Sequence, residues 1–166
     1  MKKISLFILM LVCINGCLFS NKKHLNYVIS DMSSFETPMW VFDENLEDKN
    51  DDYEYFISGT DDYDKTLCKK NALFIATEKI VAKISKEIIS SGNYNNVKTD
   101  YIKNLIRLNL FNVEKVDNYW EQKKYKKSFG ANDDYNIYSC YEAIKIKKEY
   151  LKQITDKVLL ILNKHN

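Results

Sequence analysis

Cysteine and histidine are the side chains of this 166-residue chain best suited to covalent or metal chemistry. The four cysteines stand at positions 13, 17, 68 and 140, and the two histidines are His24 and His165. These histidines are not spaced for joint ligation of a metal ion, and no thiol or carboxylate motif accompanies them. We therefore expect both histidines on the surface, no metal site and no cofactor.

Cys17 differs from the other cysteines in the residues that precede it. The chain begins with Lys2 and Lys3, continues with an apolar run over 4–14, and reaches the sequence Ile14-Asn15-Gly16-Cys17. The run is too short to cross a bilayer, which needs about 20 apolar residues. A positive start followed by a short apolar segment is the layout of a secretory signal peptide. An aliphatic residue three positions before the cysteine and a small one directly before it are typical of a bacterial lipoprotein signal.

This pattern predicts a specific modification. Cleavage falls between Gly16 and Cys17, and the Cys17 sulfur receives a diacylglycerol. Cys13 does not fit the same role because the bulky Val12 precedes it. Acyl chains contribute about 0.8 kcal/mol per buried CH₂, so two or three of them form an effectively permanent anchor. The other interpretations of this segment are an uncleaved transmembrane anchor and a buried first helix.

Cys68 and Cys140 remain once Cys17 is acylated. An even pair of thiols in an exported compartment permits a disulfide. We favour two separate buried thiols, because free cysteine packs like a small apolar side chain; the disulfide stays open as the alternative. Cys68 lies on a predicted apolar helix stripe, so it is not expected to act as a nucleophile.

Composition narrows the classes of function. The length predicts one domain, and 45% hydrophobic residues supply enough apolar material for a core. A single arginine and a formal net charge of +2 argue against nucleic-acid binding. The acidic run over 43–54 lacks the spacing of a calcium-binding loop. No phosphate-binding loop or nucleophile-elbow motif is present, and we expect no enzymatic activity.

The predicted elements follow from periodicity and from turn residues. A strand is expected over 53–59 and a long helix over 66–91, ended by Gly92. The interval 100–120 is ambiguous, and we predict a strand over 106–121, a hairpin loop over 121–134 with Gly130 near its tip, a strand over 135–146 and a helix over 147–162. The core stripe of the long helix recurs in steps of four: Cys68, Ala72, Ala76, Ile80, Ile84 and Ile88.

These elements predict the domain organisation. Residues 1–16 form the lipoprotein signal peptide, 17–37 a polar lipid-anchored tether, and 38–166 a single globular domain. The order strand, helix, strand, strand, helix predicts an α/β (α+β) two-layer fold. In it, a small antiparallel or mixed sheet is packed by the long central helix and the C-terminal helix.

Aromatic and basic residues raise two questions of surface contact. The 12 tyrosines and 2 tryptophans are expected mainly in core and strand packing. The alternative is an exposed aromatic patch for a protein partner, with Trp40 and Trp120 as its anchors. Four lysines at 123, 124, 126 and 127 are expected to form a solvated strand end, and the alternative is contact with anionic lipid.

Several short motifs also resemble a known family: the lipobox cysteine, Pro-x-Trp-Val, a Tyr-rich strand ending in glycine, and a helix with small residues in its stripe. The matching positions are Cys17, Pro38, Trp40, Val41, Gly59, Cys68, Ala72, Ala76, Trp120 and Tyr135. Over about residues 38–162 the chain resembles the small bacterial outer-membrane lipoproteins of the twenty-kilodalton-lipoprotein (LPP-twenty-like) family. The family usually has alanine where Cys68 stands, and a turn richer in Gly and Ser before the helix.

The resemblance implies a lipid-anchored envelope protein, sometimes flagellum-associated or surface-antigenic, without an established catalytic site. We expect a non-catalytic structural or interaction module, held at the outer membrane by its N-terminal lipid, that contacts an envelope protein or itself and no nucleic acid. The first alternative is a surface-exposed antigen or adhesin that binds a host or neighbouring protein. The second is an enzyme or small-ligand carrier, which needs a concave pocket with converging polar groups.

Overall fold

A computed structural model describes residues 26–43, 50–91, 94 and 97–165 of the chain. The predicted signal peptide, the predicted lipidation residue Cys17, His24 and part of the acidic run lie outside these residues. The elements in chain order are β1 (Tyr27–Met32), α2 (Trp40–Asp43), β2 (Tyr53–Asp62), α3 (Lys65–Ser90), α4 (Thr99–Asn109), β3 (Glu114–Tyr125), the short 3-10 helix η1 (Lys127–Phe129), β4 (Tyr135–Lys147) and α5 (Lys148–His165).

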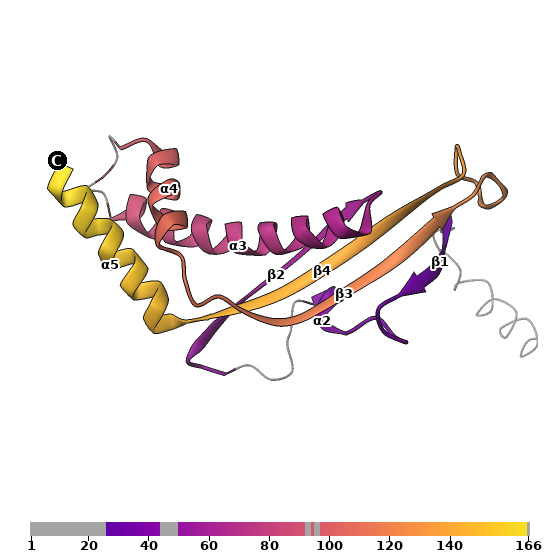
Figure 1. Cartoon of the computed structure of the whole chain (residues 1–166), viewed down its shortest axis with the longest axis horizontal. Helices are drawn as coiled ribbons and strands as arrows, with labels where there is room; N and C mark the ends of the chain where they lie inside the picture. Colours follow the sequence, from indigo (N-terminus) through magenta and orange to yellow (C-terminus); the bar gives the residue numbers. More distant parts are fainter. Residues whose placement is uncertain (1–25, 44–49, 92–93, 95–96, 166) are drawn as a thin grey trace, which may run out of the picture.

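The four strands form one antiparallel sheet in the order β1-β3-β4-β2. The predicted two-layer α+β fold is therefore confirmed. In Figure 1, β3 and β4 run along most of an elongated molecule, α3 lies along one side of the sheet, and α4 and α5 gather at the end opposite the β3–β4 hairpin. We call the surface of the sheet under α3 the helix face and the other surface the open face.

Helix α3 shows why local sequence specifies this layer. Its first turn is capped by the carboxylate of Asp64, which accepts a hydrogen bond from the backbone N–H of Leu67 at 2.7 Å. All six residues of the predicted stripe, from Cys68 to Ile88, are buried. The long central helix and its core side are thus confirmed.

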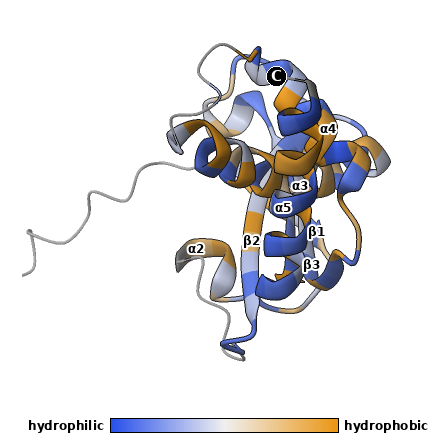
Figure 2. Cartoon of the chain, turned by 90° about the vertical axis from the view of Figure 1, so that its left-hand side faces the viewer, coloured by the Kyte–Doolittle hydropathy of each residue, from blue (hydrophilic) through white to orange (hydrophobic). Residues whose placement is uncertain are grey.

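The main hydrophobic core lies on the helix face and is almost wholly aliphatic. Isoleucines of α3 meet Ile144 and Ile146 of β4, and α4 and α5 close the core from the far end. Figure 2 looks at that end and shows hydrophobic and hydrophilic residues alternating along the helices. Burying each large aliphatic side chain contributes about 1.5–3 kcal/mol of folding free energy. This core therefore supplies most of the hydrophobic stabilisation of the domain.

The predicted strand over 106–121 is wrong in its first part and the predicted loop over 121–134 begins too early. Residues Thr99–Asn109 form α4, and β3 begins only at Glu114 and continues to Tyr125. Ile102 and Ile106, four residues apart, are both buried against the other helices. The helical spacing therefore decides this segment, and the positive φ of 55° at Asn112 helps the chain turn into β3.

The tether predicted over 17–37 is also corrected. Within it, Tyr27–Met32 forms the edge strand β1, which pairs with β3 from Tyr27↔Tyr125 to Met32↔Glu121. Four of its six side chains are exposed, so the strand has no hydrophobic pattern to mark it. The folded domain consequently includes residues before the predicted boundary at 38.

Among the helices that the structure describes, none combines the length and the apolar character required to span a bilayer.

Candidate functional site

Cys68 of α3 and Cys140 of β4 form a disulfide, with their Cα atoms 5.8 Å apart. The favoured interpretation of two separate thiols is therefore wrong, and the alternative left open by the sequence is the one observed. Both residues are fully buried. The bond joins residues 72 positions apart and fastens the start of α3 to the sheet, so these sulfurs act as a cross-link.

Trp120 packs beside this cross-link in a small cluster with Cys68, Ala72 and Cys140. The Lys65 ammonium lies 3.1 Å from the centroid of the Trp120 ring, a cation–π contact. The ring is only 8% exposed. Trp120 therefore packs in the core, as the favoured interpretation of the aromatic residues predicts, and the alternative of an exposed partner anchor is not observed.

Trp40, on the open face, also packs in the core. It is 6% exposed and packs against Ile57, Tyr119 and Ala143. Its indole Nε1 donates a hydrogen bond of 3.0 Å to a carboxylate oxygen of Asp117. Trp40 holds α2 on the sheet, and it offers no surface to a partner in this conformation.

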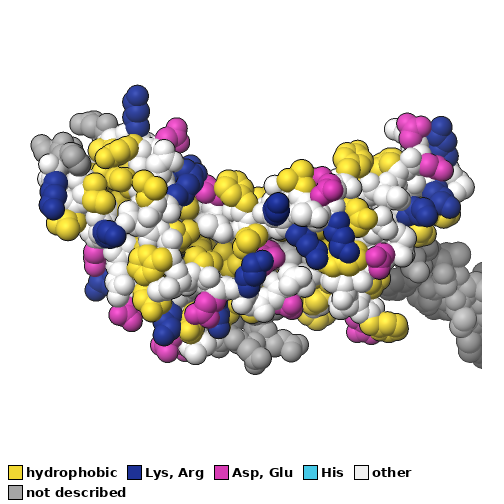
Figure 3. Space-filling model, viewed as in Figure 1, with side chains coloured by type: hydrophobic (Ala, Val, Ile, Leu, Met, Phe, Trp, Pro, Cys, Tyr) yellow, Lys and Arg dark blue, Asp and Glu magenta, His cyan; other side chains and the backbone are white. Residues whose placement is uncertain are grey.

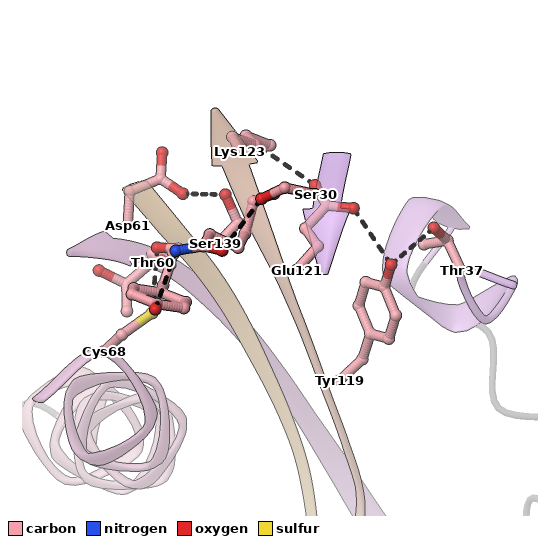
Figure 4. Close-up of polar contacts among 11 residues, drawn as sticks. Ser30, Thr37, Thr60, Asp61, Cys68, Tyr119, Glu121, Lys123 and Ser139 are labelled. Carbon is pink, nitrogen blue, oxygen red and sulfur yellow. Dashed lines mark hydrogen bonds and ion pairs between the residues drawn. The ribbon is translucent and has the colours of Figure 1, made fainter. Parts of the chain in front are cut away.

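A polar network occupies the middle of the open face. Thr37 and Tyr119 share a hydrogen bond of 3.0 Å, and the Tyr119 hydroxyl donates onward to Glu121 Oε2 at 3.1 Å. Lys123 Nζ lies 3.3 Å from Glu121 Oε1, and both of these side chains are mostly buried. Figure 4 shows Tyr119 between Thr37 and Glu121, with Lys123 beyond.

The same network extends onto β4 and β2. Ser139 of β4, fully buried, donates a hydrogen bond to Asp61 of β2. The Tyr141 ring lies directly over Gly59. A Cβ atom at position 59 would come within 2.8 Å of two carbons of this ring. Any side chain at position 59 would therefore displace the Tyr141 ring from the sheet.

Electrostatics fix the protonation states in this network. Burial alone lowers the pKa of Lys123, but Tyr141, Glu121 and Asp61 together raise it above its ordinary value. Burial raises the pKa of Tyr119, and also that of Tyr141. At neutral pH Lys123 stays charged and both phenols stay protonated. General acid–base chemistry needs groups that titrate near the working pH, whereas these three hold fixed states.

A second buried carboxylate lies on the helix face. Glu142 of β4 is nearly fully buried, and Lys115 Nζ reaches to 3.1 Å from its Oε1. The contact is an ion pair whose geometry does not make a hydrogen bond, since that oxygen accepts none. The Lys115 side chain is itself mostly exposed, so the pair joins the buried sheet to the surface.

An apolar groove of about 500 Å³ lies between α3 and the segment that leads from α4 into β3. Its lining includes Leu73, Phe74, Leu110, Phe111 and Val113. Arg107 closes one side through two hydrogen bonds to Glu78, at 2.7 and 2.6 Å. This hydrogen bonding from Arg107 lowers the pKa of Glu78.

A second hollow of about 460 Å³ lies at the β3–β4 hairpin end, and tyrosine rings and short polar side chains line it. Among the described residues no three His, Cys, Asp or Glu side chains are grouped to hold a metal ion. The candidate sites are therefore a polar network, an apolar groove and a tyrosine-lined pocket.

The network was missed by reasoning from sequence, although part of its signal was present. Tyr119, Glu121 and Lys123 alternate along β3 and so share one face of the sheet. The predicted strand ended at 121, which separated Lys123 from its neighbours. Cys17 and Gly16 lie outside the described residues, so the structure does not place them.

Compared with models of protein families, with curated proteins and with solved structures, the chain matches none. The resemblance to the small outer-membrane lipoproteins stays a prediction.

Proposed function

We propose that this chain is a bacterial envelope protein anchored by a lipid on Cys17, and that its folded domain is a non-catalytic interaction module. The observation that carries the proposal is the N-terminal sequence, in which Lys2 and Lys3, a short apolar run and Ile14-Asn15-Gly16-Cys17 follow in order.

The buried cross-link supports the exported location. Disulfides form and persist in oxidising compartments and are rare in the cytosol. Cys68 and Cys140 are bonded within the domain, so neither competes with Cys17 for acylation. An acylated Cys17 would leave no free thiol in the mature chain.

The place where the folded domain begins supports an orientation of the module relative to the membrane. Tyr27, the first residue of β1, pairs with Tyr125 beside the β3–β4 hairpin. An anchor that precedes β1 therefore attaches at the hairpin end, and α4 and α5 lie at the other end of the elongated molecule (Figure 1). The module would present its helical end away from the membrane.

That helical end also carries exposed apolar side chains. Phe74 of α3 is 61% exposed and Leu108 of α4 is 82% exposed. Tyr101 of α4 and Phe111, which follows α4, are also exposed. Figure 3 shows hydrophobic side chains interspersed with lysines and carboxylates on this part of the surface. Exposed apolar groups of this kind suit contact with an envelope protein or with a second copy of the chain.

Mass spectrometry of the mature N-terminus tests the anchor. We expect a chain that begins at Cys17 and carries two or three acyl chains, and a Cys17→Ser chain that loses the acyl mass and leaves the detergent phase. Cys13→Ser is the matched control, because it changes a cysteine four residues away and keeps the lipobox. An unacylated N-terminus in the wild type, or equal loss in Cys13→Ser, would overturn the proposal.

Protease treatment of intact cells then separates the two forms of the proposal. A domain that is protected until the outer membrane is permeabilised faces the periplasm, where envelope proteins are the available partners. A domain that is removed from intact cells is surface-exposed, which favours an antigen or adhesin that binds a host or neighbouring protein.

A further inference from the structure

The pocket at the hairpin end combines aromatic rings with neutral polar groups. Its rings are those of Tyr63, Tyr125 and Tyr135, and its amides are those of Asn26 and Asn132. These residues come from the position directly before β1, the β2–α3 turn, both strands of the hairpin and the hairpin loop. Segments far apart in the sequence therefore meet around one hollow.

The three rings form a continuous aromatic wall. Tyr125 and Tyr135 are stacked, with ring centroids 4.6 Å apart and planes 10° apart. Tyr63 meets Tyr135 edge-on at 6.4 Å. Tyr63 is nevertheless 73% exposed, so most of its surface is available to a ligand.

Small residues leave the space open. Gly130 and Ala131 lie at the hairpin tip and line the pocket. Gly130 has a φ of 91°, which favours glycine. A Cβ at this position would stand 3.3 Å from the Asn26 side-chain oxygen, so it would crowd the pocket lining.

The charge at the rim is already balanced. Asp133 lines the pocket, and Lys127 Nζ lies 3.1 Å from its carboxylate. The Lys127 backbone N–H also donates to the neighbouring Asp134 at 2.7 Å. Because this carboxylate already has a cation beside it, a net charge on a ligand would add little to its binding free energy.

We infer that this pocket binds a neutral pyranose sugar. A sugar ring has an apolar C–H face, which can stack on tyrosine, and a rim of hydroxyls, which can pair with the amides of Asn26 and Asn132 and with the Asp133 carboxylate. A purely apolar ligand would leave the two amides without partners, which is costly. Pockets of this size usually combine aromatic walls with a few polar groups that fix orientation.

Two sources could supply such a sugar: the headgroup of a glycolipid or a soluble glycan. Asn26 lies nine residues after Cys17, a stretch of chain that reaches at most about 30 Å. If Cys17 is lipidated as proposed, the pocket stays within reach of membrane headgroups. Sugar binding itself does not rest on the anchor, so each can fail without the other.

The test uses the purified full chain in a polyoxyethylene detergent, which contains no sugar. Methyl glycosides of glucose, galactose and N-acetylglucosamine are titrated, and the backbone amide shifts of Gly130 and Asn132 are followed by NMR. We expect at least one glycoside to bind with a dissociation constant of about 1 mM, a modest affinity for a single small ligand. Galactosyl diacylglycerol in mixed micelles, compared with diacylglycerol alone, then distinguishes the headgroup source from the soluble one.

Matched variants separate the pocket from general surface effects. Tyr63→Ala should weaken binding at least tenfold, and Asn132→Ala severalfold. Tyr101→Ala, an exposed tyrosine on α4, should leave the affinity within twofold. The inference is overturned if none of the three glycosides and no glycolipid shifts these amides, or if Tyr101→Ala weakens binding as much as Tyr63→Ala.

Discussion

The two faces of the sheet are stabilised in different ways. The helix face is covered by the 26-residue α3, and its core is built mainly from isoleucine, valine, leucine and alanine, with Phe56 and Tyr94 added. Among the described residues, the open face is covered by the four-residue α2 and the chain around it. Its small core adjoins the network of Tyr119, Glu121 and Lys123. The same strands thus bear a mainly aliphatic layer on one side and, on the other, a small core beside a polar network.

This difference has an energetic meaning. Aliphatic burial is non-directional and grows with the area removed from water. Buried polar groups contribute little net free energy when paired and cost much when one partner is lost. We therefore expect the helix face to set the stability of the domain, and the open face to hold α2 and β1 in place.

The sharpest test of this comparison truncates one isoleucine on each face. Ile144→Ala on the helix face should lower the free energy of unfolding by about 3–4 kcal/mol, because its cavity cannot easily collapse. Ile57→Ala should cost less, since its buried cluster is small and is bordered by the partly exposed Met32, Val41 and Tyr141. Chemical denaturation measures both, and an equal or larger loss for Ile57→Ala would contradict the comparison.

The cross-link between α3 and β4 should have the next largest effect. Replacing Cys68 and Cys140 together by alanine should cost about 2–4 kcal/mol, because the unfolded chain gains freedom. Reduction of the disulfide in the wild type should lower the free energy of unfolding by a similar amount, measured by chemical denaturation. A variant as stable as the oxidised wild type would show that α3 is held by packing alone.

The sequence predicted the helix face better than the open face, for a physical reason. The α3 stripe lies within one segment, so periodicity alone reveals it. The open-face network draws Thr37, Asp61 and Ser139 from three separate segments, and no spacing in the sequence joins them. Strand β1 escaped because its exposed side chains carry no hydrophobic pattern, and only pairing with β3, more than 85 residues later, defines it.

The pairing of Cys68 with Cys140 shows the same limit. Their compartment and even number allowed a disulfide, but only the register of β4 beside the first turn of α3 brings the sulfurs together. From the sequence alone, the two tryptophans could likewise be taken for anchors that contact a partner. In the fold, each is enclosed by neighbours from distant segments.

A smaller effect is expected from the hydroxyl at the centre of the open-face network. Tyr119→Phe removes the hydrogen bonds to Thr37 and Glu121 and should cost about 1–2 kcal/mol. Tyr135→Phe, at an exposed tyrosine, is the matched control and should be neutral within error. A Tyr119→Phe chain with unchanged stability would mean that water replaces the lost hydroxyl without cost, and that the network does not position α2.

The smallest effect concerns the charge pair beside the groove, on the helical side of the molecule. The hydrogen bonds from Arg107 lower the pKa of Glu78, so this carboxylate stabilises the folded state when it is ionised. The contribution should be present above the pKa of Glu78 in the unfolded chain and should disappear as the pH falls through its lower pKa in the folded chain. Because both side chains are partly exposed, solvent screening keeps the contribution small.

Melting temperatures of the wild type and Glu78→Gln across acidic and neutral pH measure this contribution. We expect a modest deficit of the variant at neutral pH that shrinks towards zero in acid. Glu87→Gln, beside the more exposed pair with Lys83, is the matched control and should show a smaller pH-dependent difference. A deficit of Glu78→Gln that grows in acid would mean that the carboxyl stabilises the fold in its protonated form, and that the ion pair does not hold α4 against α3.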